Sequence, residues 1–189
     1  MPMRCGPWSA ITAKVRTTNK IALLVLLLCL PSSALSWEGV VLSVHDGDTL
    51  TVQHAETGAR VKIRLHGIDA PELAGGTWPA QPWCKRSRDF LRELAPVGSH
   101  VDMLDKGRDR YGRTVAAVNL PDGRVAQEEL LRAGMAWVFP WYCTDCRAWE
   151  ALQAEAVEAR RGLWSDKNPV PPWDWRKGKR NSPAGAGLS

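Results

Sequence analysis

Alternating hydrophobic and polar positions predict several short β-strands between residues 38 and 120. In residues 59–66, Val61, Ile63 and Leu65 fall on one face, because successive side chains of a strand point to opposite faces. The complete set of expected strands is 38–45, 49–54, 59–66, 99–104 and 113–120. We expect the first three to form a meander.

Hydrophobic residues at helical spacing predict helices over residues 84–94, 126–134 and 148–161. A proline or a glycine lies at the end of each segment or just after it, at Pro96, Gly134 and Gly162, and would end the helix. Residues 67–83 are rich in glycine and proline and are expected to form an irregular loop. This order of elements predicts an α+β, mainly β fold, in which helices pack on a small antiparallel barrel.

The first 36 residues have the pattern of a signal peptide. Four basic residues precede an apolar run at 21–30, and Ala34 and Ser36 have the spacing of a small-residue cleavage signal. The apolar run is roughly half as long as a bilayer span requires, so a membrane anchor is the less favoured interpretation. We expect cleavage after Ser36, a mature chain that begins at Trp37, and a secreted or periplasmic protein.

The mature chain divides into a folded domain over residues 37–166 and a tail over 167–189. The tail is rich in proline and tryptophan, then basic at 176–180, then small and polar. Such a segment is expected to be docked or flexible, with a disordered end. The basic run is expected to be solvated or to bind polyanions weakly.

The charge balance excludes one class of function. The chain has 25 Lys and Arg residues against 20 Asp and Glu, but four of the basic residues precede residue 37. The remaining 21 basic and 20 acidic residues are too balanced for a protein that coats nucleic acid through its overall charge. Binding of a polyanion would depend on where individual charges lie.

Three cysteines remain after cleavage: Cys84, Cys143 and Cys146. In an oxidising compartment the simplest outcome is one structural disulfide and one free thiol, with the pairing left open. Cys84 bonded to either of the others would close a loop of about sixty residues. The C-x-x-C spacing at 143–146 has no second pair and no nearby histidine, which argues against a zinc site.

Four acidic residues at strand ends and in loops are candidates for chemistry: Asp46, Asp48, Asp69 and Glu72. In a meander the first and third strands end on the same side of the sheet, so these acids would cluster there. Clustered like charges are costly unless a cation lies among them, and oxygen ligands suit Ca²⁺ or Mg²⁺. The alternative is that residues 46–48 form an ordinary turn and 69–72 a solvated loop.

Two arginines favour the catalytic interpretation. Arg64 lies on the polar face of the third strand, and Arg113 lies at the start of the fifth. A divalent cation and two guanidinium groups would neutralise a phosphate and stabilise a five-coordinate transition state, while a remaining carboxylate activates water. Without a cation the acids would repel a phosphate, so the charge layout predicts a metal-dependent phosphodiesterase.

These residues lie in motifs that resemble the staphylococcal-type thermonuclease family, the family of micrococcal nuclease. The motifs run in order from about residue 38 to 165 and comprise VLSVHDGDTLTV, RLHGIDAPE, DRYGRTVAAV, EELLRAGMAWV and RRGLW. The resemblance implies an OB-type five-stranded barrel with three packed helices. It also implies a Ca²⁺-dependent enzyme that hydrolyses DNA and RNA and leaves 3′-phosphate ends.

The resemblance further implies a metal site. Asp48, Asp69 and the backbone carbonyl of Ala70 would bind Ca²⁺, and Asp46 would lie in the outer shell. The family often has threonine at position 70, and alanine changes little if only the carbonyl is used.

Catalytic and substrate-binding roles follow from the same resemblance. Glu72 would act as the general base, and Arg64 and Arg113 would bind the phosphate. Arg110 and Tyr111 would line the nucleotide pocket.

The aromatic residues after the second predicted helix differ from those of the best-known family members. Trp137 and Phe139 are expected to pack in the core, whereas Trp141 and Tyr142 are the candidates for base stacking. We further expect a monomer whose partners are DNA and RNA, with single strands preferred.

Two other classes of function stay open at this point. The first is a catalytically inactive OB-fold module that binds single-stranded nucleic acid or a protein partner. The presence of all the acids and both arginines argues against it. The second is an exported structural domain, held by a disulfide, with no role in nucleic-acid chemistry.

Overall fold

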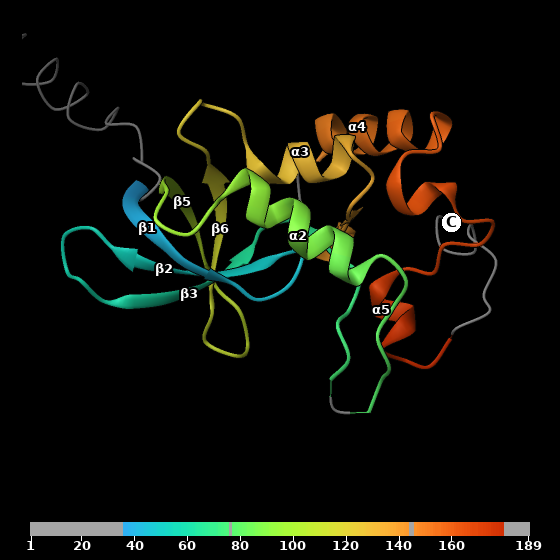
Figure 1. Ribbon diagram of the computed structural model, residues 1–189, viewed down its shortest axis with the longest axis horizontal. Helices are drawn as coiled ribbons and strands as arrows, with labels where there is room; N and C mark the ends of the chain where they lie inside the picture. Colours follow the sequence, from blue (N-terminus) through green and yellow to red (C-terminus); the bar gives the residue numbers. More distant parts are fainter. Residues whose placement is uncertain (1–35, 76, 144–145, 180–189) are drawn as a thin grey trace, which may run out of the picture. The chain divides into compact units, whose positions relative to one another are not determined.

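Five strands close into a barrel in the computed structural model of the chain (Figure 1). The structure describes residues 36–75, 77–143 and 146–179. The barrel strands are β1 (Ser36–Val44), β2 (Thr49–His54), β3 (Arg60–Leu65), β5 (His100–Arg108) and β6 (Thr114–Asn119), paired in the order β1-β2-β3-β6-β5. All five expected strands are present, and the predicted mainly β barrel of the α+β class is confirmed.

The barrel is mixed, so the expectation of a fully antiparallel barrel is wrong. Strands β3 and β6 pair in parallel, with Ile63 opposite Thr114 and Leu65 opposite Ala116, whereas the other pairs are antiparallel. The reason is geometric. Directions cannot alternate all the way around a closed ring with an odd number of strands, so at least one neighbouring pair has to be parallel.

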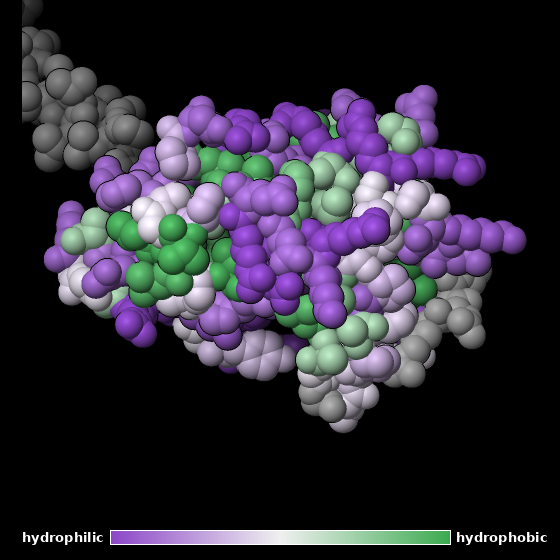
Figure 2. Space-filling model, in the orientation of Figure 1, coloured by the Kyte–Doolittle hydropathy of each residue, from purple (hydrophilic) through white to green (hydrophobic). Residues whose placement is uncertain are grey.

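Three helices lie near their predicted positions: α2 (Cys84–Leu94), α3 (Ala126–Arg132) and α4 (Arg147–Glu158). Helices α2 and α3 pack on the barrel, whereas α4 packs on α3 and β7. Leu91 of α2 and Leu130 of α3 are fully buried in the same core as Ile63 and Leu50. The outer side of α2 is covered by hydrophilic side chains (Figure 2), as expected of a helix that buries one stripe of residues.

A buried glutamine joins α3 to the barrel. The side chain of Gln127 accepts a hydrogen bond from the Val118 N–H (3.2 Å) and donates one to the Ala116 carbonyl (2.9 Å). Gln127 has no exposed surface, so both bonds replace water for groups that would otherwise be unsatisfied.

Several short elements lie outside the predicted set. Strand β4 (Ile68–Asp69) pairs with β7 (Trp137–Val138) in a separate two-stranded sheet. Two 3₁₀ turns, η1 (Pro140–Tyr142) and η2 (Gly162–Ser165), and the helix α5 (Pro172–Trp175) follow. Each is too short to show a hydrophobic period, and β4 and β7 form only because distant parts of the chain meet.

The tail docks on the loop that follows β4. Trp175 of α5 is 9% exposed, and its indole Nε1 donates to the Pro79 carbonyl at 2.9 Å. The Gln81 side chain donates to the Val170 carbonyl at 2.6 Å. Figure 1 shows α5 beside this loop. Of the two expectations for the tail, residues 170–176 take the docked one, residues 177–179 are exposed, and 180–189 lie outside the described residues.

The cysteine pairing is local. Cys143 and Cys146 form the disulfide, with Cα atoms 5.5 Å apart, and Cys84 is a buried free thiol in α2. The alternative of a long loop closed by Cys84 is therefore wrong.

Within the described residues, no helix is both long and apolar enough to cross a bilayer. The predicted signal peptide falls almost entirely on residues 1–35, which lie outside the described part of the chain.

Replacement of Gly134 by alanine should destabilise the fold much more than the same change at Gly123. Both glycines have positive φ, +66° and +84°, so each substitution carries a conformational cost of about 1–2 kcal/mol. A Cβ at Gly134 would also lie 2.3 Å from the Arg161 carbonyl oxygen, whereas a Cβ at Gly123 meets nothing within 4 Å. Denaturant unfolding should show a further loss of about 1–3 kcal/mol for Gly134→Ala. Equal losses for the two variants would contradict this close packing.

Candidate active site

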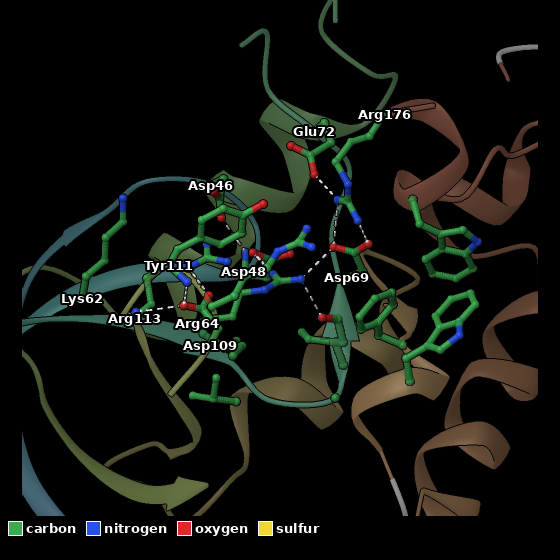
Figure 3. Close-up of a pocket in the computed structure, with 18 of the residues that line it drawn as sticks. Asp46, Asp48, Lys62, Arg64, Asp69, Glu72, Asp109, Tyr111, Arg113 and Arg176 are labelled. Carbon is green, nitrogen blue, oxygen red and sulfur yellow. Dashed lines mark hydrogen bonds and ion pairs between the residues drawn. The ribbon is translucent and has the colours of Figure 1, made fainter. Parts of the chain in front are cut away.

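A pocket of about 880 Å³ opens beside the barrel strands and contains most of the predicted site residues (Figure 3). The predicted side chains that line it are Asp46, Asp48, Arg64, Asp69, Glu72, Arg110, Tyr111, Arg113 and Trp141. Ala70 is buried next to Asp69. The side chain of Tyr142 is outside the described part of the structure.

Barrel pairing explains why acids from two segments meet. The turn between β1 and β2 carries Asp48, and Thr49 pairs with Arg64 across β2 and β3. The carbonyl of Asp48 accepts a hydrogen bond from the Leu65 N–H at 2.8 Å, which fixes this turn against the end of β3. Asp69 follows in β4, where pairing with Trp137 of β7 holds it in a buried position.

Arg64 lies between two buried carboxylates. Its guanidinium forms an ion pair with Asp48 and a second with Asp69, where the N–O distance is 2.7 Å. It also donates to the Ile68 carbonyl at 3.1 Å. Burial by itself would lower the pKa of Arg64, but Asp48 and Asp69 raise it, so the guanidinium stays charged.

The two carboxylates differ in their affinity for a proton. Burial would raise the pKa of Asp48, but the charge of Arg64 and its hydrogen bonds outweigh it and lower the pKa. The Ala70 N–H donates to Asp48 at 2.7 Å and contributes to this shift. For Asp69, burial dominates and raises the pKa, although Arg64 acts in the opposite direction. Asp48 is therefore the more firmly ionised of the pair.

Asp46 stands next to this pair in the same turn. It accepts a hydrogen bond from the Asp48 N–H at 3.0 Å. Burial, followed by the neighbouring charge of Asp48, raises the pKa of Asp46 to about 7. Asp46 is thus only partly ionised at neutral pH, and it adds less negative charge than the sequence indicates.

Glu72 pairs with an arginine that the sequence analysis did not include in the site. Arg176 of the tail forms an ion pair with Glu72 and a second with Asp69, where the N–O distance is 2.9 Å. Burial raises the pKa of Glu72, and Arg176 offsets this only in part. The expectation that the basic run at 176–180 is solvated is wrong for Arg176. The run is visible in the sequence, but 104 residues separate Arg176 from Glu72, and no local pattern predicts their contact.

Arg113 lies on the other side of the acidic residues from Arg176 (Figure 3). The Nε of Arg113 donates a hydrogen bond to Asp109 at 2.6 Å, and the backbone N–H of Arg113 donates a second at 2.9 Å. The neighbouring Tyr111 ring is 70% exposed, with the guanidinium carbon of Arg110 4.9 Å from the ring centroid. This side of the pocket therefore offers cationic groups and an exposed ring at one place.

Aromatic rings form the wall next to the tail. Phe139, Trp141 and Trp173 lie with ring centroids 5.2–5.6 Å apart, and Trp141 is 65% exposed. Phe139 was expected in the core, but it is half-buried in this wall because the β7 strand ends before it. Trp137 is buried, as expected.

The carboxylate oxygens of Asp48 and Asp69 are the kind of ligand that a hard cation prefers, but they do not by themselves form a complete coordination site. No group of three or more His, Cys, Asp or Glu side chains in residues 36–75, 77–143 and 146–179 is arranged to hold a metal. Asp48 and Asp69 nevertheless present buried carboxylate oxygens that are already neutralised by cationic side chains. Such oxygens suit Ca²⁺ or Mg²⁺ with water completing the coordination.

The chain matches the family described as staphylococcal nuclease homologue over residues 62–166. The protein belongs to this family. The match begins within β3 and covers Arg64, Asp69, Glu72 and Arg113, while the turn with Asp46 and Asp48 lies before it.

Similar proteins support the assignment of the chain to this family. An uncharacterized endonuclease of Escherichia coli O157:H7 is 40% identical over 159 residues, which cover 84% of this chain and 97% of the relative. A micrococcal nuclease of Shigella flexneri is 33% identical over 171 residues, covering 85% and 92% of the two chains. A staphylococcal-like nuclease of Arabidopsis thaliana is 38% identical over 136 residues, covering 69% of this chain and 38% of the relative.

Substitution of Arg64 by glutamine should destabilise the protein strongly. Among the described residues the change leaves buried Asp48 without an ion-pair partner, and loss of one member of a buried ion pair costs about 3–5 kcal/mol. Arg132 is a matched control because it also pairs with two acids, Glu128 and Glu129, but is 44% exposed. Arg132→Gln should cost less than about 1 kcal/mol. Similar unfolding free energies for the two variants would show that Arg64 does not neutralise the buried acids.

Proposed function

We propose that this member of the family is an exported, Ca²⁺-dependent nuclease that hydrolyses phosphodiester bonds of DNA and RNA. The observation that carries this proposal is the pocket in which buried Asp48 and Asp69 meet Arg64, with Glu72 and Arg113 on either side. The names of the relatives, which include endonuclease and micrococcal nuclease, support the same activity.

In the proposed reaction Glu72 acts as the general base. It takes a proton from a water molecule, whose oxygen attacks the phosphorus atom. The bond between phosphorus and the 5′-oxygen breaks, this oxygen takes up a proton from solvent, and the phosphate stays on the 3′-oxygen. The raised pKa of Glu72, caused mainly by burial, makes it a better proton acceptor than an exposed glutamate.

Arg64 and Arg113 bind the phosphate in this proposal. Their guanidinium groups present paired N–H donors that match phosphate oxygens, and they stabilise the charge that builds up in the transition state. Arg64 is held at the acids by its ion pairs, while Arg113 is held by Asp109. Both side chains are therefore already held in place before the substrate binds, and binding does not have to order them.

The Ca²⁺ ion would be held by Asp48, Asp69 and the Ala70 carbonyl, with Asp46 in the outer shell. When bound, it supplies positive charge that offsets the acids and polarises a phosphate oxygen. Both carboxylates are buried, and burial raises the pKa of Asp69 even beside Arg64 and Arg176, which supports a further positive charge at this place.

Substrate contacts and location complete the proposal. Arg110 and Tyr111 would contact the nucleotide on one side of the pocket, and Trp141 and Tyr142 would stack on bases. We propose that single strands are preferred, because stacking requires an unpaired base face. The pattern of the first 36 residues supports export to the periplasm or the medium, and the active form is proposed to be a monomer.

Replacement of Glu72 by glutamine should abolish cleavage and preserve binding. The amide has nearly the same shape but accepts no proton at neutral pH, so the rate should fall by at least about 10²-fold. Glu56→Gln is the matched control, because Glu56 is exposed in the turn between β2 and β3. Cleavage and affinity are measured with a labelled single-stranded oligonucleotide in Ca²⁺. Unchanged cleavage by Glu72→Gln would exclude Glu72 as the base, and binding without cleavage by the native protein would favour an inactive module.

Addition of Ca²⁺ should stabilise the native protein, and EDTA should stop cleavage. A ligand at one hundred times its dissociation constant stabilises a protein by about 2.7 kcal/mol. Thermal unfolding should show this gain for the native protein and for Asp89→Asn, whose carboxylate is 51% exposed. Asp69→Asn should show none. Cleavage that persists in EDTA, or a Ca²⁺ response that survives Asp69→Asn, would refute the metal assignment.

A further inference from the structure

We propose that Arg176 is a third phosphate-binding residue of the site and that nucleic acid, on binding, draws its guanidinium away from Glu72. This inference rests on the proposed nuclease function. It assigns to the tail a direct role in substrate binding and in the release of the general base.

The tail presents Arg176 from a fixed position. Trp175, the preceding residue, is buried with its indole bonded to Pro79. Pro172 at the start of α5 is also buried. The backbone that carries Arg176 is therefore anchored on both sides of α5, and its side chain is aimed into the pocket rather than into solvent (Figure 3).

The same anchor fixes the loop that carries Glu72. The Gln81 side-chain oxygen accepts a hydrogen bond from the Glu72 N–H at 3.0 Å, and the Glu72 carbonyl accepts one from the Gln81 N–H at 2.8 Å. The amide group of Gln81 also donates to Val170 of the tail. Because Gln81 is buried, these bonds are shielded from water, and Glu72 and Arg176 are held in one connected structure.

A phosphate group can replace the Glu72 carboxylate as the partner of the Arg176 guanidinium. The side chains are 31% and 24% exposed, so an anion that enters the pocket reaches both. A guanidinium binds a phosphate through two parallel N–H donors, as it does a carboxylate. Arg176 also keeps a bond to Asp69, so it can turn toward a phosphate without leaving the pocket.

Exchange has a consequence for the base. A carboxylate that accepts a guanidinium bond has its charge compensated and part of its lone-pair capacity occupied. In the described structure the Arg176 guanidinium therefore occupies part of one Glu72 oxygen, Oε1, that a water molecule would otherwise use. A phosphate that takes over the Arg176 guanidinium frees Glu72 at the moment when substrate is present.

The test measures affinity for a single-stranded oligonucleotide in a Glu72→Gln background, in Ca²⁺ and at several salt concentrations. This background prevents cleavage and removes the Glu72 charge, so loss of Arg176 cannot act by exposing it. Adding Arg176→Gln should weaken binding about tenfold and reduce the slope of log K against log salt by about 0.7, the contribution of one phosphate contact to a single strand. Arg176→Lys should keep most of the slope. Lys167→Gln, which removes an exposed charge from the same tail, should change neither quantity.

With Glu72 intact, Arg176→Gln should raise KM about tenfold and leave kcat within a few-fold. Unchanged affinity, salt slope and KM in Arg176→Gln would overturn the proposal. Tighter binding or a raised kcat/KM would also overturn it, because Arg176 would then only block the site. These results count against Arg176 alone if the native protein cleaves nucleic acid. If the native protein neither binds nor cleaves it, the proposed function itself fails.

Discussion

The ion pairs of Arg64 with Asp48 and Asp69 are the interaction on which the site depends. Two carboxylates that are 6% and 1% exposed cannot both stay ionised in the protein without a cation between them. Arg64 supplies that charge from the barrel itself, because its side chain at the end of β3 reaches both Asp48 in the turn before β2 and Asp69 in β4. The same strand that closes the barrel therefore also supplies the positive charge that stabilises the buried acids.

The local parts of this arrangement are predictable from sequence, and the long-range parts are not. Alternation identifies the five barrel strands and helical spacing identifies α2, α3 and α4, because each pattern repeats within its own element. The acids and Arg64 are also found, since a meander fixes which strand ends are neighbours. Arg176 and the half-buried Phe139 are missed, because their surroundings come from segments that no local pattern connects. The parallel pair β3–β6 is missed for the same reason, although five strands in a closed barrel require at least one parallel pair.

Guanidinium groups and a metal ion meet the same demand in different ways. Arg64 and Arg176 form ion pairs with Asp48, Asp69 and Glu72 in the described structure, and each offers N–H donors of fixed direction. A hard cation would instead gather oxygen atoms without directional donors. A cation bound to Asp48 and Asp69 would therefore share their carboxylate oxygens with Arg64 and Arg176.

The position of Arg176 in the chain has a consequence for folding. The barrel, the acids and Arg64 all precede residue 120, whereas α5 comes more than fifty residues later. A chain in which only the barrel has folded has a pocket with its acids and Arg64 in place, but without the guanidinium that pairs with Glu72. The site gains that charge only when α5 docks on the loop after β4, so packing of the tail is the step that completes the pocket.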